Sequence, residues 1–430
     1  MSLRIKAIVL AASLAVTAVF PSAAHATSCT PSKQLASSNI AQLHVEVLEA
    51  ATGKTLFAKN ENSAERSASV MKVLTAAVAL DVLGPDYQIT TNVYSDTQNP
   101  GHIYLVGAGD VTLSRMPGNV TSYYARAPKL DSLTRVVSSW SKQSGVAITD
   151  VYIDSSLFGG NNEWHSTWNR RGLSDGYMAP VSALQIDAAR LTSSRNKLVW
   201  LARRTDAPVT QAGQLFVESL NSRGLAPGLI AKEKKLPTSS QVIASVQSRP
   251  MREWVENMLR VSDNSLAEAL ARLSSLKLGL DGSMRSLTPL YKQVLAARGL
   301  DVLKLRIVDA SGLSRDNQVP VSLVNEVLAL VNQGVGNYSV IESGLPVSGE
   351  KGSLRTRFAS GNLSAAKGLV LAKTGYITSG YSLAGFLTAR DGTELIFTVY
   401  NLSERARITQ RNALDNLVYR FYQCGAKLSG

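Results

Sequence analysis

The feature that most constrains the fold is a helix that is apolar on nearly every side. Residues 69–83 carry apolar side chains at helical spacing without a continuous polar face, and Gly84-Pro85 then ends the helix. A helix of this kind is stable only when other elements surround it. The chain can supply them, because 430 residues, 45% hydrophobic and 18% charged, predict about two or three globular domains.

The first 26 residues have the pattern of a secretory signal peptide. Arg4 and Lys6 precede a largely apolar run over residues 7–20, and Ala24-His25-Ala26 fits the small-residue pattern of a cleavage site. The alternative is an uncleaved anchor, although the run is short for a bilayer span. Cleavage near Ala26 predicts an exported protein of the periplasm or the extracellular cell envelope.

The two cysteines, Cys29 and Cys424, lie near the two ends of the mature chain. Export favours a disulfide between them, since such bonds persist in oxidising compartments. The alternative for Cys29 is lipid attachment. The preceding Ala26-Thr27-Ser28 lacks the large aliphatic residue of a lipid-attachment signal, and lipidation would leave Cys424 unpaired. We therefore predict the disulfide.

Charge and composition exclude several classes of function. Signal cleavage removes two basic residues and no acidic one, so the net charge falls from +13 to +11. That charge suits contact with an anionic wall or membrane surface. An exported chain without a basic-aromatic motif is not expected to bind nucleic acid. With four His, two Cys and no HExxH, CxxC, GxxxxGK[ST] or GxGxxG pattern, we expect no metal site and no cofactor.

The order of expected elements predicts an α+β fold that is interrupted by an inserted domain. The strands expected near the two ends of the chain are 44–48, 55–58, 369–373, 381–389 and 394–400, with a closing helix over 405–422. The elements expected in the middle are strands at 89–94, 103–106 and 151–153 and a helix over 211–225. We predict that residues 27–87 and 248–430 form one domain and that residues 88–247 form a mixed α/β domain inserted into it.

Ser69-Val70-Met71-Lys72 places a serine and a lysine on one face of the apolar helix. A serine hydroxyl needs a neighbouring base to act as a nucleophile, and a lysine whose pKa is lowered can serve. Six SxxK tetrads occur, at Ser69, Ser139, Ser194, Ser274, Ser348 and Ser364. Ser69 stands out because it begins a buried helix, where backbone N–H groups and the helix dipole stabilise an oxyanion.

Two further short motifs carry candidate site residues. Ser262-Asp263-Asn264 precedes Ser265-Leu266-Ala267-Glu268, which fits a helix capping box, so the triplet is expected at a helix start. Lys373-Thr374-Gly375 ends a predicted strand. A lysine and a hydroxyl at a strand edge can hold a carboxylate, and glycine leaves space for a peptide backbone. Alone, each motif is more often an ordinary helix cap or strand end.

In the order SxxK, SxN, KTG the three motifs form the signature of penicillin-binding proteins and serine β-lactamases. The chain resembles the class C low-molecular-mass penicillin-binding proteins, the serine-type D-alanyl-D-alanine carboxypeptidase/endopeptidase family. The gap of 193 residues between Ser69 and Ser262 fits the large insertion of that family. The further segments that carry the resemblance are 109–114, 154–158, 177–184, 309–315 and 345–349.

The resemblance implies a penicillin-binding-protein/serine β-lactamase-like transpeptidase domain, with an antiparallel sheet and helices. It also implies action on peptidoglycan stem peptides that end in D-Ala-D-Ala, with β-lactam antibiotics as covalent inhibitors. Ser69 would be the nucleophile and Lys72 its general base, while Ser262 would relay the proton to the leaving D-alanine. We expect repulsion from Lys373 to help keep Lys72 neutral.

The remaining site residues would bind the substrate. The resemblance implies that Asn264 holds the substrate amide and that Lys373 and Thr374 hold the terminal carboxylate. Gly375 would leave room for the substrate backbone, and the backbone N–H groups of Ser69 and Tyr376 would form the oxyanion hole. Tyr376 departs from the family pattern, which has a small hydroxyl residue after the KTG motif.

Other functions stay open at this point. One alternative is a β-lactamase that uses the same acyl-enzyme chemistry. A second is a catalytically inactive cell-wall-binding or penicillin-sensing protein, and a third is an exported α/β protein whose motifs coincide by chance. Nor does the sequence separate carboxypeptidase from endopeptidase action, because both cut beside a D-alanine.

Overall fold

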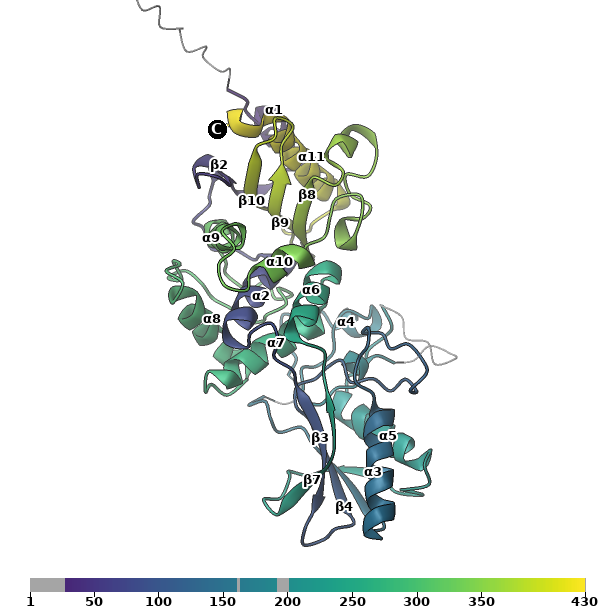
Figure 1. Ribbon diagram of the computed structural model, residues 1–430. Coiled ribbons are helices and arrows are strands. Elements are labelled where there is room, and N and C mark those ends of the chain that lie inside the picture. The colour runs from purple at the N-terminus through teal and green to yellow at the C-terminus, as the bar shows by residue number, and fades with distance from the viewer. Residues whose placement is uncertain (1–27, 161–162, 192–200, 430) are drawn as a thin grey trace, which may run out of the picture.

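The computed structural model describes residues 28–160, 163–191 and 201–429. The predicted signal peptide and the SxxK tetrad at Ser194 therefore lie outside the described residues. The described part is elongated, with one β-sheet toward each end and a group of helices between the two sheets (Figure 1). In these ranges no helix is both long enough and apolar enough to cross a membrane.

Both ends of the chain build the first sheet. Its strands are β1 (Gln42–Glu49), β2 (Thr55–Lys59), β8 (Val370–Ile377), β9 (Gly380–Thr388) and β10 (Glu394–Leu402). They lie in the order β2-β1-β10-β9-β8, and every neighbouring pair is antiparallel. β1 pairs with β10 from Gln42↔Leu402 to Glu49↔Leu395. The five strands predicted for the two ends of the chain are confirmed.

Helices cover both faces of this sheet. Side chains alternate along a strand, so that Phe397 and Val399 pack into one apolar cluster while Ile396 and Tyr400 pack into another. The first cluster includes α11 (Ile408–Cys424), the predicted closing helix, and the second includes α9 (Val321–Asn332). The terminal helices are α1 (Ser32–Leu35), which contacts α11, and α11 itself.

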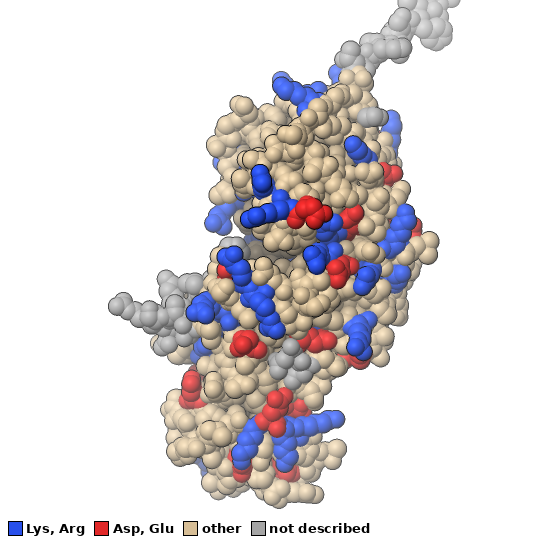
Figure 2. All heavy atoms as spheres, turned by 180° about the vertical axis from the view of Figure 1, so that it is seen from behind, with Lys and Arg blue, Asp and Glu red and all other residues tan. Residues whose placement is uncertain are grey.

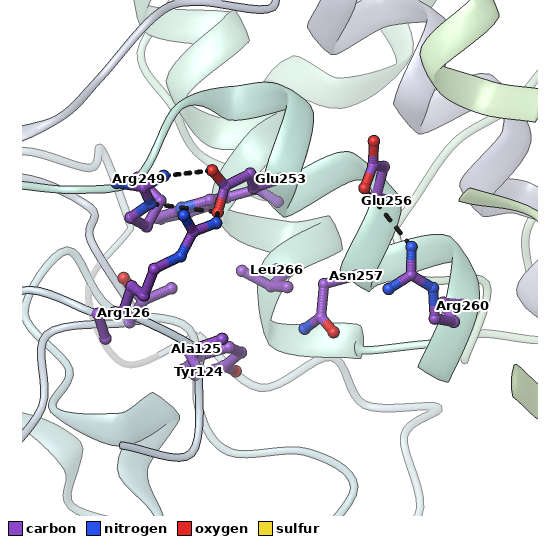
Figure 3. Close-up of a pocket in the computed structure, with 12 residues that line it drawn as sticks. Tyr124, Ala125, Arg126, Arg249, Glu253, Glu256, Asn257, Arg260 and Leu266 are labelled. Carbon is purple, nitrogen blue, oxygen red and sulfur yellow. Dashed lines mark hydrogen bonds and ion pairs between the residues drawn. The ribbon is translucent and has the colours of Figure 1, made fainter. Parts of the chain in front are cut away.

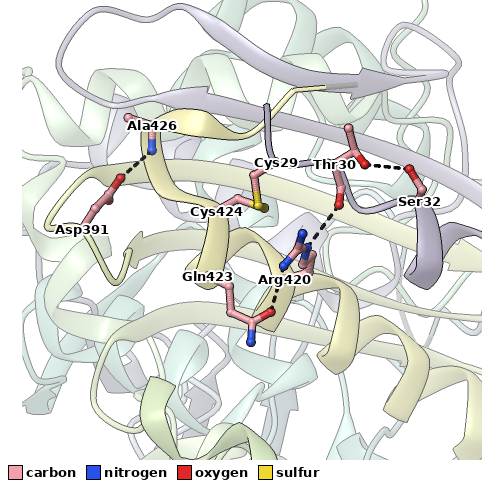
Figure 4. Close-up of a disulfide and its surroundings, with 8 residues drawn as sticks. All are labelled: Cys29, Thr30, Ser32, Asp391, Arg420, Gln423, Cys424 and Ala426. Atoms are coloured by element: carbon pink, nitrogen blue, oxygen red, sulfur yellow. Dashed lines mark hydrogen bonds between the residues drawn. A yellow bond between two sulfur atoms is a disulfide. The ribbon is translucent and has the colours of Figure 1, made fainter. Parts of the chain in front are cut away.

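The predicted disulfide is present in the structure. Cys29 is bonded to Cys424 at the end of α11, and their Cα atoms lie 5.4 Å apart. Figure 4 shows that Arg420, one turn earlier on the same helix, reaches the amino-terminal segment. Its Nε donates to the Thr30 carbonyl oxygen at 3.1 Å. The start of the described chain is therefore fastened covalently and by hydrogen bonds to its last helix.

The apolar helix of the sequence lies at the centre of the molecule as α2 (Met71–Val82), and its residues from Met71 to Leu80 are all buried. The helices around it are α6 (Met251–Val261), α7 (Asn264–Lys277), α8 (Leu287–Ala296), α9 and α10 (Ser339–Gly344). The predicted burial is confirmed. The α-helix begins at Met71 rather than at residue 69, because Ser69 lies in a 3₁₀ turn, Ala68–Val70, that leads into it.

The second sheet is formed by the middle of the chain. Its strands are β3 (Thr90–Asp96), β4 (His102–Val106), β5 (Asp150–Asp154), β6 (Ala231–Glu233) and β7 (Ser240–Gln247). They lie in the order β6-β5-β4-β3-β7, with parallel pairs at β4–β5 and β5–β6 and antiparallel pairs elsewhere. All five lie within residues 88–247, and those limits of the inserted domain stay a prediction.

Helices α3 (Leu130–Ser144) and α5 (Pro208–Asn221) pack side by side against this mixed sheet, and a short helix, α4 (Arg171–Ser174), lies between them in the sequence. The helix predicted over 211–225 begins and ends earlier, since Pro208 starts it. The sequence reading did not identify α3, β6 or β7. Residues 227–240, predicted as a loop, contain β6.

Candidate active site

The three motifs meet at a cleft of about 380 Å³ along the β8 edge of the first sheet. The side chains and backbone that line the cleft belong to Ser69, Ser262, Ser353, Arg357, Thr374, Gly375, Tyr376, Tyr381 and Arg411. Five of these nine were predicted as site residues. The structure thus brings together segments that are separated by more than 300 residues along the chain.

The turn that carries Ser69 is held from several sides. Ser382 on β9 donates a hydrogen bond to the Ser67 carbonyl oxygen at 2.7 Å. Ala68 has a φ of +48°, a value that a residue other than glycine adopts only when its surroundings enforce it. Gly312 packs so closely that a Cβ there would lie 1.9 Å from the Ala68 carbonyl oxygen. The position of the Ser69 hydroxyl is therefore set before any substrate arrives.

Lys72 is completely buried beside Ser69. Its Nζ donates to the Ser69 Oγ at 2.9 Å, to the Asn264 Oδ1 at 2.8 Å and to the Ser311 carbonyl oxygen at 2.6 Å. Burial lowers the pKa of Lys72 from 10.5 to about 8, against the opposing effect of Asp309 and other nearby carboxylates. An amine that loses its proton near neutral pH and touches a serine hydroxyl has the chemistry of a general base.

Burial is the main cause of the lowered pKa of Lys72, against the opposing effect of three nearby carboxylates. Burial and the nearby Lys72 also hold the pKa of Lys373 well below 10.5. Repulsion between two ammonium groups disfavours the charge on both of them. That Lys373 helps to keep Lys72 neutral stays a prediction.

Ser262 joins α6 to α7 and lines the cleft. It ends α6 in the left-handed conformation, with a φ of +61°, and Asp263 then caps α7 by accepting from the Leu266 N–H at 3.1 Å. The predicted capping box at residues 265–268 is therefore wrong, because Ser265 and Glu268 both lie inside the helix. The expectation that the triplet lies at a helix start is confirmed.

Asn264 uses both ends of its side-chain amide within the protein. Its Oδ1 accepts from Lys72, and its Nδ2 donates to the Tyr177 carbonyl oxygen at 2.9 Å. Asn264 thus links Lys72 to the loop that contains Tyr177, within the predicted inserted domain. Its predicted contact with a substrate amide stays a prediction.

Glu268 and Asp309 belong to the site, although the sequence reading did not select them. Glu268 is buried and accepts from the backbone N–H groups of Ala310 and Ser311 at 3.0 and 2.9 Å. Asp309 accepts from the Gly312 N–H at 2.6 Å in the same turn. Together they hold the Ser311 carbonyl oxygen against Lys72. Burial and the nearby Asp309 raise the pKa of Glu268 to about 7.

Lys373 lies behind the cleft surface rather than in it. The side chain is completely buried, and its Nζ donates to the Ser262 Oγ at 2.9 Å and to the Thr374 carbonyl oxygen at 2.7 Å. The Thr374 hydroxyl does line the cleft and hydrogen-bonds the Ser353 hydroxyl at 2.6 Å. The predicted binding of a carboxylate by Lys373 and Thr374 stays a prediction, and Thr374 is the member that a ligand can reach.

Gly375 and Tyr376 complete the wall beside Ser69. A Cβ at Gly375 would lie 3.1 Å from the Ser69 nitrogen and 2.0 Å from the Ser382 Oγ, so only glycine leaves the Ser69 N–H open to a ligand. The Tyr376 side chain is 55% exposed and stacks on Tyr381 at a ring distance of 4.7 Å. An oxyanion hole at these backbone N–H groups stays a prediction that this close approach favours.

The other SxxK tetrads in the described ranges do not pair their serine with their lysine. Instead, each serine hydroxyl donates to a backbone carbonyl oxygen of another residue. The four serines are Ser139, Ser274, Ser348 and Ser364. Across the described residues there is also no group of three or more His, Cys, Asp or Glu side chains placed to hold a metal ion.

A second hollow of about 280 Å³ lies between α6 and residues 124–127 (Figure 3). Its charged side chains neutralise one another: Glu253 accepts from Arg126 at 2.9 Å and also pairs with Arg249. Arg260 pairs with Glu256 at 3.5 Å. None of the described residues that line this hollow is a serine or a lysine, so we place the candidate active site in the cleft at Ser69.

Known proteins resemble the chain over most of its length. Residues 32–199 and 192–421 match the D-Ala-D-Ala carboxypeptidase 3 (S13) family. The chain is 30% identical over 396 residues to Carboxypeptidase DacB of Mycolicibacterium smegmatis, covering 91% of this chain and 82% of that protein. It is 26% identical over 427 residues to the D-alanyl-D-alanine carboxypeptidase of Actinomadura sp., covering 83% and 77%.

The fold of the chain also resembles that of a solved penicillin-binding protein. Penicillin binding protein 4 of Haemophilus influenzae superposes with a TM-score of 0.75 at 19% identity, covering 91% of this chain and 99% of that chain. This likeness confirms the predicted fold class, and the family match confirms the resemblance drawn from the motifs. The chain belongs to the D-Ala-D-Ala carboxypeptidase 3 (S13) family.

Proposed function

We propose that this protein is a serine D-alanyl-D-alanine carboxypeptidase that acts on peptidoglycan stem peptides and that β-lactams acylate at Ser69. The observation that carries the proposal is the contact of the buried Lys72 amine with the Ser69 hydroxyl at 2.9 Å. Family membership and the names of the relatives, a carboxypeptidase and a D-alanyl-D-alanine carboxypeptidase, support the same reaction.

In the first step the neutral Lys72 takes the proton of Ser69 as the oxygen attacks the carbonyl carbon between the two D-alanines. Negative charge develops on the carbonyl oxygen, and the backbone N–H groups of Ser69 and Tyr376 stabilise it. General-base and oxyanion contributions are each worth about two to three decades of rate. The close approach of Gly375 to Ser69 supports this arrangement.

In the second step the C–N bond breaks and the leaving D-alanine amine takes a proton through Ser262. Ser262 takes in exchange the proton that Lys72 removed from Ser69, so Lys72 is neutral again, and the hydrogen bond from Lys373 holds the Ser262 Oγ in place. Water then attacks the ester on Ser69, with Lys72 again as the base, and releases the shortened peptide. Asn264 serves this chemistry by holding Lys72 in place.

We further propose that the protein works outside the cytoplasm. The Cys29–Cys424 disulfide favours an oxidising compartment, and peptidoglycan lies outside the cell membrane. The expected contact with an anionic surface stays a prediction from net charge. Figure 2 offers it no single basic patch, because Lys and Arg on that face are interspersed with Asp and Glu.

The test is the intact mass of the mature protein after incubation with benzylpenicillin, for the wild type and for Ser69→Ala. An adduct on the wild type alone, mapped to Ser69, together with release of D-alanine from a D-Ala-D-Ala peptide, is the expected result. Steady hydrolysis of penicillin without a stable adduct would instead indicate a β-lactamase. Neither adduct nor penicillin consumption by the folded wild type would favour the inactive wall-binding or penicillin-sensing alternative.

A further inference from the structure

The cleft at Ser69 is lined by two arginines that differ in their electrostatic partners. Arg357 is paired: its Nε lies 3.1 and 3.2 Å from the two carboxylate oxygens of Asp415. Arg411 lines the same cleft, yet within the described ranges no carboxylate lies within ion-pair distance of it. Its one hydrogen bond to a side chain is to the Asn412 Oδ1 at 3.2 Å.

The position of Arg411 on α11 explains why it has no carboxylate partner among the described residues. Arg411 and Asp415 lie four residues apart on α11 and therefore on one face of it. Asp415 would be the natural partner for Arg411, but its carboxylate is buried and engaged by Arg357. The Arg411 Nε is itself buried without a hydrogen-bond partner among the described residues. A guanidinium in this position has donors available for an anion that enters the cleft.

Two neutral hydroxyls lie in the same cleft as this cation. Ser353 and Thr374 are hydrogen-bonded to each other at 2.6 Å, so one of the two O–H groups stays free to donate to a ligand. Lys373, the other candidate cation, is completely buried and does not line the cleft. The Tyr376 side chain, which stacks on Tyr381, offers no small hydroxyl beside Thr374.

We propose that Arg411 binds the α-carboxylate of the departing D-amino acid, while the Ser353–Thr374 hydroxyl pair donates to the same group. The assignment rests on the proposed function and deepens it. With this assignment, the cleft selects its leaving group by the free carboxylate next to the scissile amide. The positive charge for this contact comes from the last helix and not from the KTG lysine.

The experiment compares two peptides that differ only at the carboxyl end: an N-acylated peptide ending in D-Ala-D-Ala and the same peptide as its C-terminal amide. The variants are Arg411→Gln, Arg411→Lys, Arg357→Gln and the matched control Arg420→Gln. Arg420 lies on the same helix, closer to its carboxyl end, and contacts Thr30 near the disulfide (Figure 4). Release of the C-terminal residue or its amide is measured as kcat/KM for each enzyme and peptide.

We expect Arg411→Gln to lower kcat/KM for the acid about 10- to 100-fold, the range for a hydrogen bond to a charged group, and to leave the amide within twofold. Arg411→Lys should keep part of the preference for the acid, because it keeps the charge without the planar fork. Arg420→Gln should behave as the wild type does. Melting temperatures of all variants show whether each is folded.

Three results would overturn the assignment. The first is an equal loss on acid and amide in Arg411→Gln, which would indicate a structural role. The second is an unchanged preference for the acid in that variant, and the third is loss of the preference in Arg357→Gln but not in Arg411→Gln. Failure of the proposed function is distinguishable from all three, since the wild type would then release no D-alanine and form no penicillin adduct at Ser69.

Discussion

The reactivity of Ser69 should follow the protonation of Lys72, and the structure indicates the pH at which it changes. With the pKa of Lys72 lowered to about 8, the amine is neutral in about one molecule in ten at pH 7. With the ordinary value of 10.5 it would be neutral in only about one in three thousand. Burial therefore raises the reactive fraction about 300-fold, which corresponds to about 3 kcal/mol.

The assay is the second-order rate constant for acylation by benzylpenicillin, measured from pH 5.5 to 9.5 by quenching and intact mass. Because the neutral amine is the active form, the rate should rise about tenfold per pH unit below pH 7 and level off above about pH 8 to 9. The sign follows from the direction of the shift, since a lysine with a lowered pKa loses its proton as the pH rises through that value.

Lys72→Arg is the matched control, because a guanidinium keeps its proton throughout this range. Its acylation rate should be negligible and show no rise with pH. A wild-type rate that is constant between pH 6 and 9, or one that still rises tenfold per pH unit up to pH 9.5, would show that burial of Lys72 does not activate Ser69. The general-base assignment would then have to be given up.

Three further predictions concern other parts of the molecule. Gly375→Ala should lower kcat about 10²- to 10³-fold in a folded enzyme by covering the Ser69 N–H; recovery of activity on adding Ser382→Ala would assign the loss to the clash with that side chain instead. Glu268→Gln keeps an acceptor oxygen but removes the charge. Because the pKa of Glu268 is raised from 4.5 to about 7, the wild type loses stability as the pH rises through this range and the buried carboxyl becomes charged. At pH 8 the free energy of unfolding of the variant should therefore exceed that of the wild type by up to about 3 kcal/mol. At pH 4 the two proteins should be equally stable. Replacing Cys29 and Cys424 together by serine should lower the free energy of unfolding by about 2–5 kcal/mol, and an unchanged denaturation midpoint would contradict a stabilising role.

The sequence predicted the parts of the site whose chemistry is encoded at short spacing. Ser69, Lys72, Ser262 and Thr374 belong to motifs of three or four residues, and the order of the motifs identified the family. Glu268 shows the limit of such reading. Its spacing from Ser265 matched a capping box. In the structure its carboxylate instead accepts hydrogen bonds from the backbone of Ala310 and Ser311, some 40 residues later in the sequence.

Arg411 and Ser353 show a second limit. Neither belongs to a motif, and each matters only because α11 and the segment before β8 close on the Ser69 cleft. No local pattern distinguishes Arg411 from the other arginines of a basic chain. Helix α3 is a different case. Its buried Leu130, Leu133 and Val137 recur at helical spacing, so closer attention to periodicity would have predicted it.

The pairing of β1 with β10 has a consequence for the order in which the chain folds during synthesis. β1 finds its partner only when the chain has been made as far as residue 402, because Gln42 pairs with Leu402. The middle sheet closes between Thr90 and Gln247 and can fold while synthesis continues. The turn at Ser311 that contacts Lys72 precedes β8, β9 and β10 in the sequence, whereas the cleft at Ser69 is complete only after nearly the full length has been made. A chain truncated before residue 370 would lack β8, β9 and β10, and we expect it to contain Ser69 without acquiring peptidase activity.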